Sequence, residues 1–201
     1  MSQTAMTPWT LLRKSGPQQR AVTLSQAKQT LRLSQTDTSH DADLLEAIDA
    51  ATEQVEHDID GACIDQEFTY FANAFPSAGQ PMALPKHPVS VVSEVAYIDS
   101  DGADQVLDVG TYLLDEGRRQ VYLVAGESWP STQPQQNAVT VTFTAGYGAT
   151  IDKVPRLLKR AILIQVGRWF YDPGGEQDGG KWETAYDNII QRVLASFYVA
   201  G

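Results

Sequence analysis

The sequence contains one cysteine, Cys63, among 201 residues, so the chain can form no disulfide bond within itself. Nothing in this cysteine usage points to a secreted protein. No stretch approaches the roughly 18 consecutive apolar residues of a membrane-spanning helix. The first residues carry neither the basic nor the apolar region of a signal peptide. We therefore expect a soluble protein, with no membrane partner, that folds in a reducing compartment.

Basic residues are scarce relative to acidic ones, because 15 Lys and Arg stand against 25 Asp and Glu and give a formal net charge of −10. A protein that grips nucleic acid by neutralising phosphates needs clustered basic side chains. The imbalance therefore argues against tight DNA binding, although it is compatible with a surface that DNA slides past. The hydrophobic share of 42% and the charged share of 20% are those of an ordinary globular protein.

Residue patterns typical of enzymes and metal sites are also missing. The three histidines are scattered along the chain, and no Gly-x-Ser-x-Gly motif surrounds a serine nucleophile. The stretch from Glu56 to Glu67 faintly resembles a calcium-binding loop, but a helix end followed by a strand accounts for it better. We therefore expect neither catalytic residues nor a metal site, and we expect Cys63 to be a small buried residue.

Apolar residues that recur every three or four positions predict four helices. These helices span 26–33, 41–60, 155–171 and 181–197. Ser25 is the expected N-cap of the first helix, and Gly61 is expected to end the second in a left-handed conformation. The expected buried stripe of the third helix comprises Leu157, Leu158, Ala161, Ile162, Gln165 and Trp169.

Between the second and third helices, the hydrophobic period changes to two, which is typical of strands. The expected strands span 66–71, 81–84, 91–98, 104–107, 111–115, 120–124 and 138–145. The last is the clearest, because Val139, Val141 and Phe143 alternate with threonines. The pattern predicts an α+β protein, in which a four-helix bundle carries an antiparallel β-sandwich-like insertion between its second and third helices.

These patterns divide the chain into three parts. Residues 1–20 are predicted to form a flexible N-terminal arm, residues 21–62 and 150–201 a helical domain, and residues 63–149 the β insertion. The arm carries an apolar island of Trp9, Leu11 and Leu12. Because such an island usually buries against another surface, these three residues are candidates for docking on a neighbouring protein.

A series of short motifs runs through the chain in a fixed order. It starts with Val22-Thr23-Leu24-Ser25-Gln26-Ala27-Lys28-Gln29-Thr30-Leu31-Arg32-Leu33 and continues through the predicted helix up to Gly61. The later motifs are Phe75-Pro76, Leu84-Pro85, Pro88-Val89-Ser90-Val91-Val92-Ser93-Glu94-Val95-Ala96-Tyr97, Asp101-Gly102, Ser128-Trp129-Pro130, Val139-Thr140-Val141-Thr142-Phe143-Thr144-Ala145-Gly146-Tyr147-Gly148, Val154-Pro155 and Ala161-Ile162-Leu163. The first motif is similar to the VTLAEAKAHLRV start of head–tail connector proteins. In order and spacing, over about residues 22–198, the series resembles this adaptor or head-completion family of long-tailed phages, prophages and gene transfer agents.

The resemblance implies a structural virion protein without catalytic activity and without a cofactor. Family members form rings, usually of twelve copies, under the portal at the capsid vertex, where they extend the DNA channel towards the tail. The implied partners are further copies of the chain, the portal protein, the next neck or tail connector, and genomic DNA that passes without specific binding. The implied location is the virion neck, after synthesis in the cytoplasm of a host bacterium.

Other functions remain open at the level of the sequence. The chain could be another structural protein of a phage tail or neck, or a small ligand-binding β module on a helical frame. Fold-level likeness alone does not separate these classes. Within the ring hypothesis, Phe197 and Tyr198 are candidates for docking on the portal, because aromatic side chains are favoured interface anchors. Closure of the helical core by the same two residues is the alternative.

Two charged helix faces also allow more than one interpretation. The acidic face of the predicted helix 41–60 comprises Asp43, Glu46, Asp49, Glu53 and Glu56. It is a candidate lining for the DNA channel, with a solvated outer surface as the alternative. The basic flank of the third helix comprises Arg156, Lys159, Arg160 and Arg168. It is either a solvated face or a docking surface for an acidic neighbour.

Overall fold

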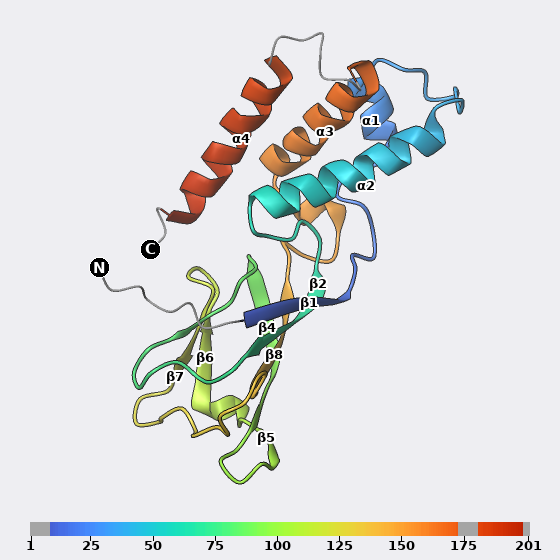
Figure 1. Ribbon diagram of the computed structural model, residues 1–201. Helices are drawn as coiled ribbons and strands as arrows, with labels where there is room; N and C mark the ends of the chain where they lie inside the picture. The colour runs from blue at the N-terminus through green and yellow to red at the C-terminus, as the bar shows by residue number, and fades with distance from the viewer. Residues whose placement is uncertain (1–8, 173–180, 199–201) are drawn as a thin grey trace. The chain divides into compact units, whose positions relative to one another are not determined.

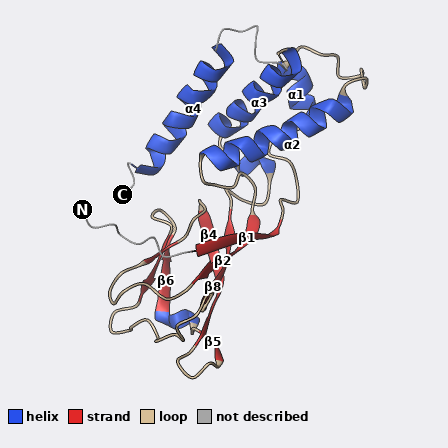
Figure 2. Cartoon of the chain, viewed as in Figure 1, coloured by secondary structure: helices blue, strands red, loops and turns tan. Residues whose placement is uncertain are grey.

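The computed structural model describes residues 9–172 and 181–198, and it leaves the side chains of Trp9 and of residues 196–198 undescribed. The chain forms two compact units (Figure 1). The β unit comprises Met1–Gly16 and Gln66–Gly146, and the helical unit comprises Pro17–Asp65 and Tyr147–Gly201. Figure 2 shows the strands in the first unit and the α-helices in the second.

The β unit contains two antiparallel sheets. The larger sheet has five strands, in the order β1 (Trp9–Ser15), β2 (Gln66–Ala72), β8 (Val139–Ala145), β4 (Val89–Ile98) and β5 (Asp104–Val106). The smaller sheet has three strands, in the order β3 (Met82–Ala83), β7 (Gln120–Leu123) and β6 (Tyr112–Asp115), and a short 3₁₀ helix, η1 (Val109–Thr111), precedes β6. Strands β1 and β5 are therefore the edges of the larger sheet, and β8 is its central strand.

Strand β8 supplies much of the buried surface of the β unit because its side chains alternate strictly between two faces. Val139, Val141 and Phe143 are fully buried, while the threonines between them are partly exposed. Phe143 pairs with Phe68 of β2, and their rings stack with centroids 5.7 Å apart. The alternation of apolar residues and threonine in the sequence therefore identifies the buried face correctly.

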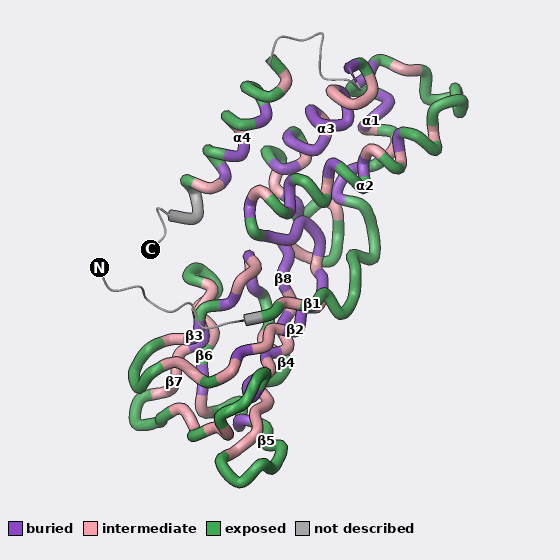
Figure 3. The backbone as a smooth tube through the Cα atoms, in the orientation of Figure 1, coloured by how far each residue is buried: buried purple, intermediate pink, exposed green. Residues whose placement is uncertain are grey.

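The helical unit contains α1 (Leu24–Thr30), α2 (Asp41–Asp58), α3 (Arg156–Tyr171) and α4 (Lys181–Tyr198), and the 3₁₀ helix η2 (Ile151–Lys153) precedes α3. Helix α3 packs against each of the other three helices. The core of the unit draws most of its fully buried aliphatic side chains from α2 and α3, including Leu44, Ile48, Val55, Leu158 and Ile162. Figure 3 shows buried positions recurring along both helices.

The N-terminus of α1 is capped by a residue other than the expected one. The hydroxyl of Thr23, rather than that of Ser25, accepts a hydrogen bond from the amide of Gln26 at 3.1 Å. The side chain of Gln26 accepts in return from the amide of Thr23 at 2.8 Å. This reciprocal capping box satisfies two amides that would otherwise lack partners, so the helix starts two residues earlier than predicted.

The C-terminus of α2 also differs from the sequence expectation. Asp60, and not Gly61, adopts the left-handed conformation, with φ of 49°. The amide of Gly61 donates to the carbonyl of Glu56 at 3.0 Å, and the amide of Asp60 donates to the carbonyl of His57 at 3.1 Å. These two bonds form a Schellman motif, in which aspartate tolerates the left-handed position better than most residues do.

A charged side chain lies inside the helical unit. Lys28 of α1 is only 4% exposed. Its Nζ lies 2.5 Å from Oδ1 of Asp41, at the start of α2, and donates to the carbonyl of Asp37 at 2.7 Å. A longer bond of 3.5 Å reaches the carbonyl of Gln35. Because these partners lie on the loop between α1 and α2 and on α2 itself, one ammonium group connects all three segments.

The structure confirms an α+β fold in which most strands lie between α2 and α3. The helices do not form a clear four-helix bundle, because α1 has only seven residues, or about two turns. Residues 9–15 of the predicted arm form strand β1, which pairs antiparallel with β2 from Trp9 opposite Ala72 to Ser15 opposite Glu67. Main-chain hydrogen bonds of this sheet therefore order part of the segment for which the sequence predicts a flexible arm.

Candidate interaction surfaces

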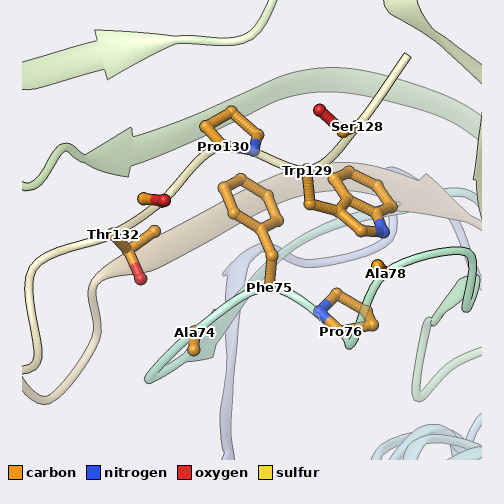
Figure 4. A pocket seen from close by; sticks show the side chains of 9 residues that line it. Ala74, Phe75, Pro76, Ala78, Ser128, Trp129, Pro130 and Thr132 are labelled. Atoms are coloured by element: carbon orange, nitrogen blue, oxygen red, sulfur yellow. The ribbon is translucent and has the colours of Figure 1, made fainter. Parts of the chain in front are cut away.

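Two loops of the β unit are joined by stacked aromatic rings (Figure 4). Phe75 and Trp129 stack with ring centroids 4.9 Å apart and an interplanar angle of 11°, and Tyr97 meets Phe75 edge-on at 5.5 Å. The indole Nε1 of Trp129 donates to the carbonyl of Gln80 at 3.0 Å. The structure thus brings together the Phe75-Pro76 and Ser128-Trp129-Pro130 motifs, which are far apart in the sequence.

A pocket of about 330 Å³ lies beside this stack. Its lining comprises Ala74, Phe75, Pro76, Ala78, Ser128, Trp129, Pro130, Ser131 and Thr132. This lining contains apolar side chains and hydroxyl groups but no carboxylate, imidazole or ammonium group. The pocket therefore lacks a general acid or base of its own, and its half-buried rings primarily fix the two loops against each other.

The acidic face of α2 is not uniform. Asp43, Glu46 and Glu53 are exposed and have no hydrogen-bond or ion-pair partner within the described ranges 9–172 and 181–198. Asp49 differs because Nε and Nη2 of Arg20 donate to its two carboxylate oxygens, each at 2.7 Å. The unpaired acidic surface of α2 is therefore formed by Asp43, Glu46 and Glu53.

Glu56 lies apart from this surface because it is 9% exposed. Its Oε1 accepts a hydrogen bond from the amide of Cys63 at 2.7 Å, so the carboxylate stabilises the turn after α2 and does not extend the exposed acidic face. Burial, together with the nearby charge of Glu56, raises the pKa of the Cys63 thiol well above its ordinary value. Cys63 is fully buried, as the sequence predicts, and the raised pKa keeps its thiol neutral and unreactive.

The predicted basic flank of α3 divides into two parts. Arg156 and Arg160 are exposed, and neither has a partner in the part of the chain that the structure describes. Arg168 instead donates to Glu183 of α4 at 2.6 Å and belongs to the contact between the two helices. Leu157, which the sequence places in the buried stripe, is 44% exposed beside the two arginines. The first turns of α3 therefore present a basic and partly apolar surface.

The apolar island of the N-terminal segment lies at an edge of the larger sheet. Leu11 is partly buried and Leu12 is 57% exposed on β1, while the side chain of Trp9 lies outside the described residues. One side of β1 pairs with β2, and no described strand pairs with its other side. An edge strand with an exposed apolar side chain can accept another chain, so docking through Trp9, Leu11 and Leu12 stays a prediction.

The two residues predicted to dock on the portal lie at the end of α4. Phe197 and Tyr198 lie in the last turn of α4, but their side chains lie outside the described residues. Earlier in the same helix, Tyr186, Ile190 and Val193 are buried in the core of the helical unit. Docking through Phe197 and Tyr198 therefore stays a prediction.

Residues 9–172 and 181–198 form neither a metal-binding cluster nor a membrane-spanning helix. Among these residues, no group of three or more His, Cys, Asp and Glu side chains is arranged to hold a metal ion. None of the helices that they form is long and apolar enough to cross a membrane. The candidate surfaces consist of exposed charges, an edge strand and an aromatic stack, which are features common in contacts between proteins.

The fold is similar to that of protein chains in gene transfer agent (GTA) particles. A chain in the virion of a native GTA particle matches with a TM-score of 0.71 and 23% identity, over 90% of this chain and 93% of that chain. A chain in the neck of an empty GTA particle, computed with C6 symmetry, matches with a TM-score of 0.71 and 22% identity, over 91% and 94%. A chain in the neck of a native GTA particle, computed with C12 symmetry, matches with a TM-score of 0.69 and 21% identity, over 91% and 93%. No protein-family model and no curated protein matches the sequence.

Proposed function

We propose that this chain is a structural protein of the neck of a phage-like or gene transfer agent particle. Its copies form an adaptor ring beneath the portal and extend the DNA channel from the capsid to the tail. The observation that carries this proposal is the likeness of fold to chains in GTA necks, over more than nine-tenths of this chain. The C6 and C12 symmetries of those necks are compatible with a ring of twelve copies.

The sequence motifs support the same proposal independently of the fold. The series that starts at Val22 and ends at Leu163 resembles that of head–tail connectors, and it draws on both units of the chain. In this proposal the helical unit builds the ring, and the β unit faces the portal, the next connector, or both. No step of the proposed function requires a cofactor, because the chain acts by holding a channel together.

The proposal is tested by removing the chain from cells that produce the particle. Without it, capsids are expected to fill with DNA but to lack tails, and supplying the chain in trans should restore tailed particles. Cryo-electron microscopy of the restored particles should place its density as a ring directly below the portal. Normal tailed particles in the absence of the chain would contradict the proposal, and density elsewhere in the tail would favour another structural role.

Within this ring, the unpaired acidic surface of α2 is proposed to line the DNA channel. Duplex DNA carries about one negative charge per 1.7 Å of its axis, so an acidic wall repels the duplex and lets it slide. The variant Glu46→Lys/Glu53→Lys should slow DNA ejection, and higher salt should restore it. The variant Glu46→Gln/Glu53→Gln removes the same charges without attracting DNA and should eject normally. Normal ejection by the lysine variant would place this surface outside the channel.

Two further contacts are proposed for the ends of the chain. The edge strand β1, with exposed Leu12, is proposed to dock on a neighbouring neck protein, and Tyr198 with Phe197 is proposed to dock on the portal. Leu12→Ser and Tyr198→Ala should each reduce incorporation into particles while the melting temperature of the free protein stays nearly unchanged. A large fall in melting temperature with normal incorporation would instead show that these residues only complete the fold.

A further inference from the structure

A polar pocket of about 400 Å³ lies in the helical unit between α2, α3 and α4. Its lining comprises Gln54, Asp58, Gln165, Arg168, Trp169, Glu183, Tyr186 and Asp187. Three carboxylates in this lining face a single guanidinium, that of Arg168, which is already paired with Glu183 at 2.6 Å. The pocket therefore has a net negative charge and favours a positively charged occupant.

One hydrogen-bond acceptor in this pocket has no donor. Gln165 is 6% exposed, and its Oε1 has no hydrogen-bond partner among the described residues. The hydroxyl of Tyr186 donates to Oδ2 of Asp58 at 2.6 Å, so the group of Gln165 that bonds to the phenol oxygen must be its amide nitrogen. A buried acceptor without a donor destabilises a protein. This oxygen is itself enclosed, so an occupant that carries N–H groups would bond to it after a movement of the side chains around it.

The exposed arginines of α3 lie on the opposite side of that helix from the pocket. Arg156 precedes Gln165 by nine residues, which is about two and a half turns at 3.6 residues per turn. Arg160 precedes Gln165 by five residues, or about 1.4 turns, and therefore also points away from it. Each copy of the chain thus carries a basic surface on one side of α3 and an acidic pocket on the other.

We propose that the basic turn Arg156–Arg160 of one copy docks at the Gln165 pocket of a second copy. A guanidinium group satisfies both requirements of the pocket, because it is positively charged and has five N–H donors. Leu157, which is 44% exposed between the two arginines, adds an apolar contact at the margin. This inference rests on the proposed ring and names the contact between its subunits.

The two surfaces differ, so the contact between copies is heterologous and leaves one surface free at each end. Heterologous contacts generate a closed ring when the rotation between neighbours divides a full turn, and an open filament otherwise. Since all copies carry both surfaces, no second protein is needed to propagate the contact. The contact therefore accounts for a ring made from a single kind of chain.

The inference is tested with two charge-reversed variants of the full chain and sedimentation velocity over a range of concentrations. The flank variant is Arg156→Glu/Arg160→Glu, and the pocket variant is Gln54→Lys/Asp187→Lys. Each should self-associate at least about 10-fold more weakly than the wild type, because like charges then oppose each other. An equal mixture of the two should recover association, because the intact pocket of the flank variant can bind the intact arginines of the pocket variant.

A matched control separates this contact from a general effect of charge. Arg118→Glu/Arg119→Glu, in the turn between β6 and β7, makes the same change in net charge as the flank variant. Because this turn belongs to the β unit and to neither proposed surface, the control should associate like the wild type. A third variant, Gln165→Leu, removes the unpaired acceptor and should weaken association several-fold. Because it also removes the amide that bonds to Tyr186, its melting temperature is measured beside its association. Equal weakening by the control, or no recovery in the mixture, would overturn the inference.

The outcomes also distinguish this inference from the proposed function. Rings that the flank and pocket variants still form, seen by negative-stain microscopy, would overturn the Arg156–Gln165 contact and leave the adaptor proposal standing. A wild-type chain that stays monomeric up to its solubility limit would overturn the contact as well. Tailed particles that assemble without the chain would instead overturn the adaptor proposal.

Discussion

The helical unit and the β unit bury their apolar side chains in different ways. In the helical unit, α2 and α3 share one continuous core, and even the charged Lys28 is enclosed beside it. In the β unit, burial concentrates on β2 and β8, whereas all three residues of β5 are exposed. Five of the seven large apolar side chains that are exposed among the described residues belong to the β unit, namely Leu12, Val91, Val106, Val109 and Leu113.

This difference separates two kinds of surface in one chain. In the helical unit, most aliphatic side chains are buried in the core of the unit, and the exposed side chains are mainly charged. The β unit keeps apolar side chains at its strand edges and turns, where they are available to another protein. Substitutions at exposed positions of the β unit should therefore alter assembly more than stability, while buried positions of either unit should alter stability first.

The strongest test of this contrast is the substitution Phe143→Ala in the central strand β8. It removes a fully buried ring that stacks on Phe68 and leaves a cavity, so the free energy of unfolding should fall by about 3–5 kcal/mol in urea denaturation. The matched control Val91→Ala lies on neighbouring β4 and is 51% exposed, so it should change the same quantity by less than about 0.5 kcal/mol. Similar losses for both variants would contradict a core concentrated at β8.

The corresponding test in the helical unit is Lys28→Ala. This change leaves the carbonyl of Asp37 without its donor and the carboxylate of Asp41 without its cation, so it should reduce the free energy of unfolding by about 2–3 kcal/mol. Arg20→Ala removes a cation from the exposed pair with Asp49 and should reduce it by less than about 1 kcal/mol. A Lys28 variant as stable as the Arg20 variant would show that the buried ammonium is dispensable.

Alkaline pH should destabilise the helical unit through Cys63. The folded state raises the pKa of this buried thiol above its ordinary value of 9.0, so the unfolded chain ionises first. The contribution is fully present below about pH 9 and falls above it, by up to about 1.4 kcal/mol per pH unit. Thermal melts between about pH 8 and pH 10.5 should show a shallower decline for Cys63→Ala than for the wild type. Parallel declines would exclude the thiol as a source of the pH dependence.

The smallest expected effect concerns the start of α1. Thr23→Ala removes the capping hydroxyl and should lower the free energy of unfolding by about 1 kcal/mol. Ser25→Ala, two residues later on an exposed position inside the helix, should leave stability unchanged or raise it slightly, since alanine has the higher helix propensity. Chemical denaturation of the two variants distinguishes the capping residues directly, and the reverse order would restore Ser25 as the cap.

Sequence periodicity predicts most helices and strands because the spacing of apolar residues indicates which face of each element is buried. The alternation at Val139, Val141 and Phe143 identifies β8, and the apolar spacing in 41–60 identifies α2 to within two residues of its end. The sequence does not predict strand β1, because its partner β2 begins about fifty residues later and no local pattern reveals such a pairing. The pairing with β2 is therefore what makes this segment an edge strand and not a flexible arm.

The candidate surfaces are less predictable than the elements. Lys28 and Glu56 are charged residues that the tertiary fold buries with specific partners, which average preferences for exposure do not anticipate. Leu157 satisfies the helical period but lies where no other element covers it. The helical period correctly predicts that Gln165 of α3 is buried, but its unpaired oxygen follows only from the positions of Tyr186 and Asp58. The charged surfaces are the exception, because Arg156 and Arg160 of α3 and Asp43, Glu46 and Glu53 of α2 are exposed as the sequence pattern indicates.

The helical unit is formed by two stretches of sequence that the β unit separates, so its two halves are synthesised at different times. Helices α1 and α2 are translated before Gln66, whereas α3 and α4 follow the 81 residues from Gln66 to Gly146. The larger sheet becomes complete when β8 emerges, so the β unit can fold on the ribosome while the apolar side of α2 still lacks α3. Contacts between such distant segments form slowly. The order of translation therefore delays the surfaces of α3, and with them the proposed contact between copies, until the β unit has been made.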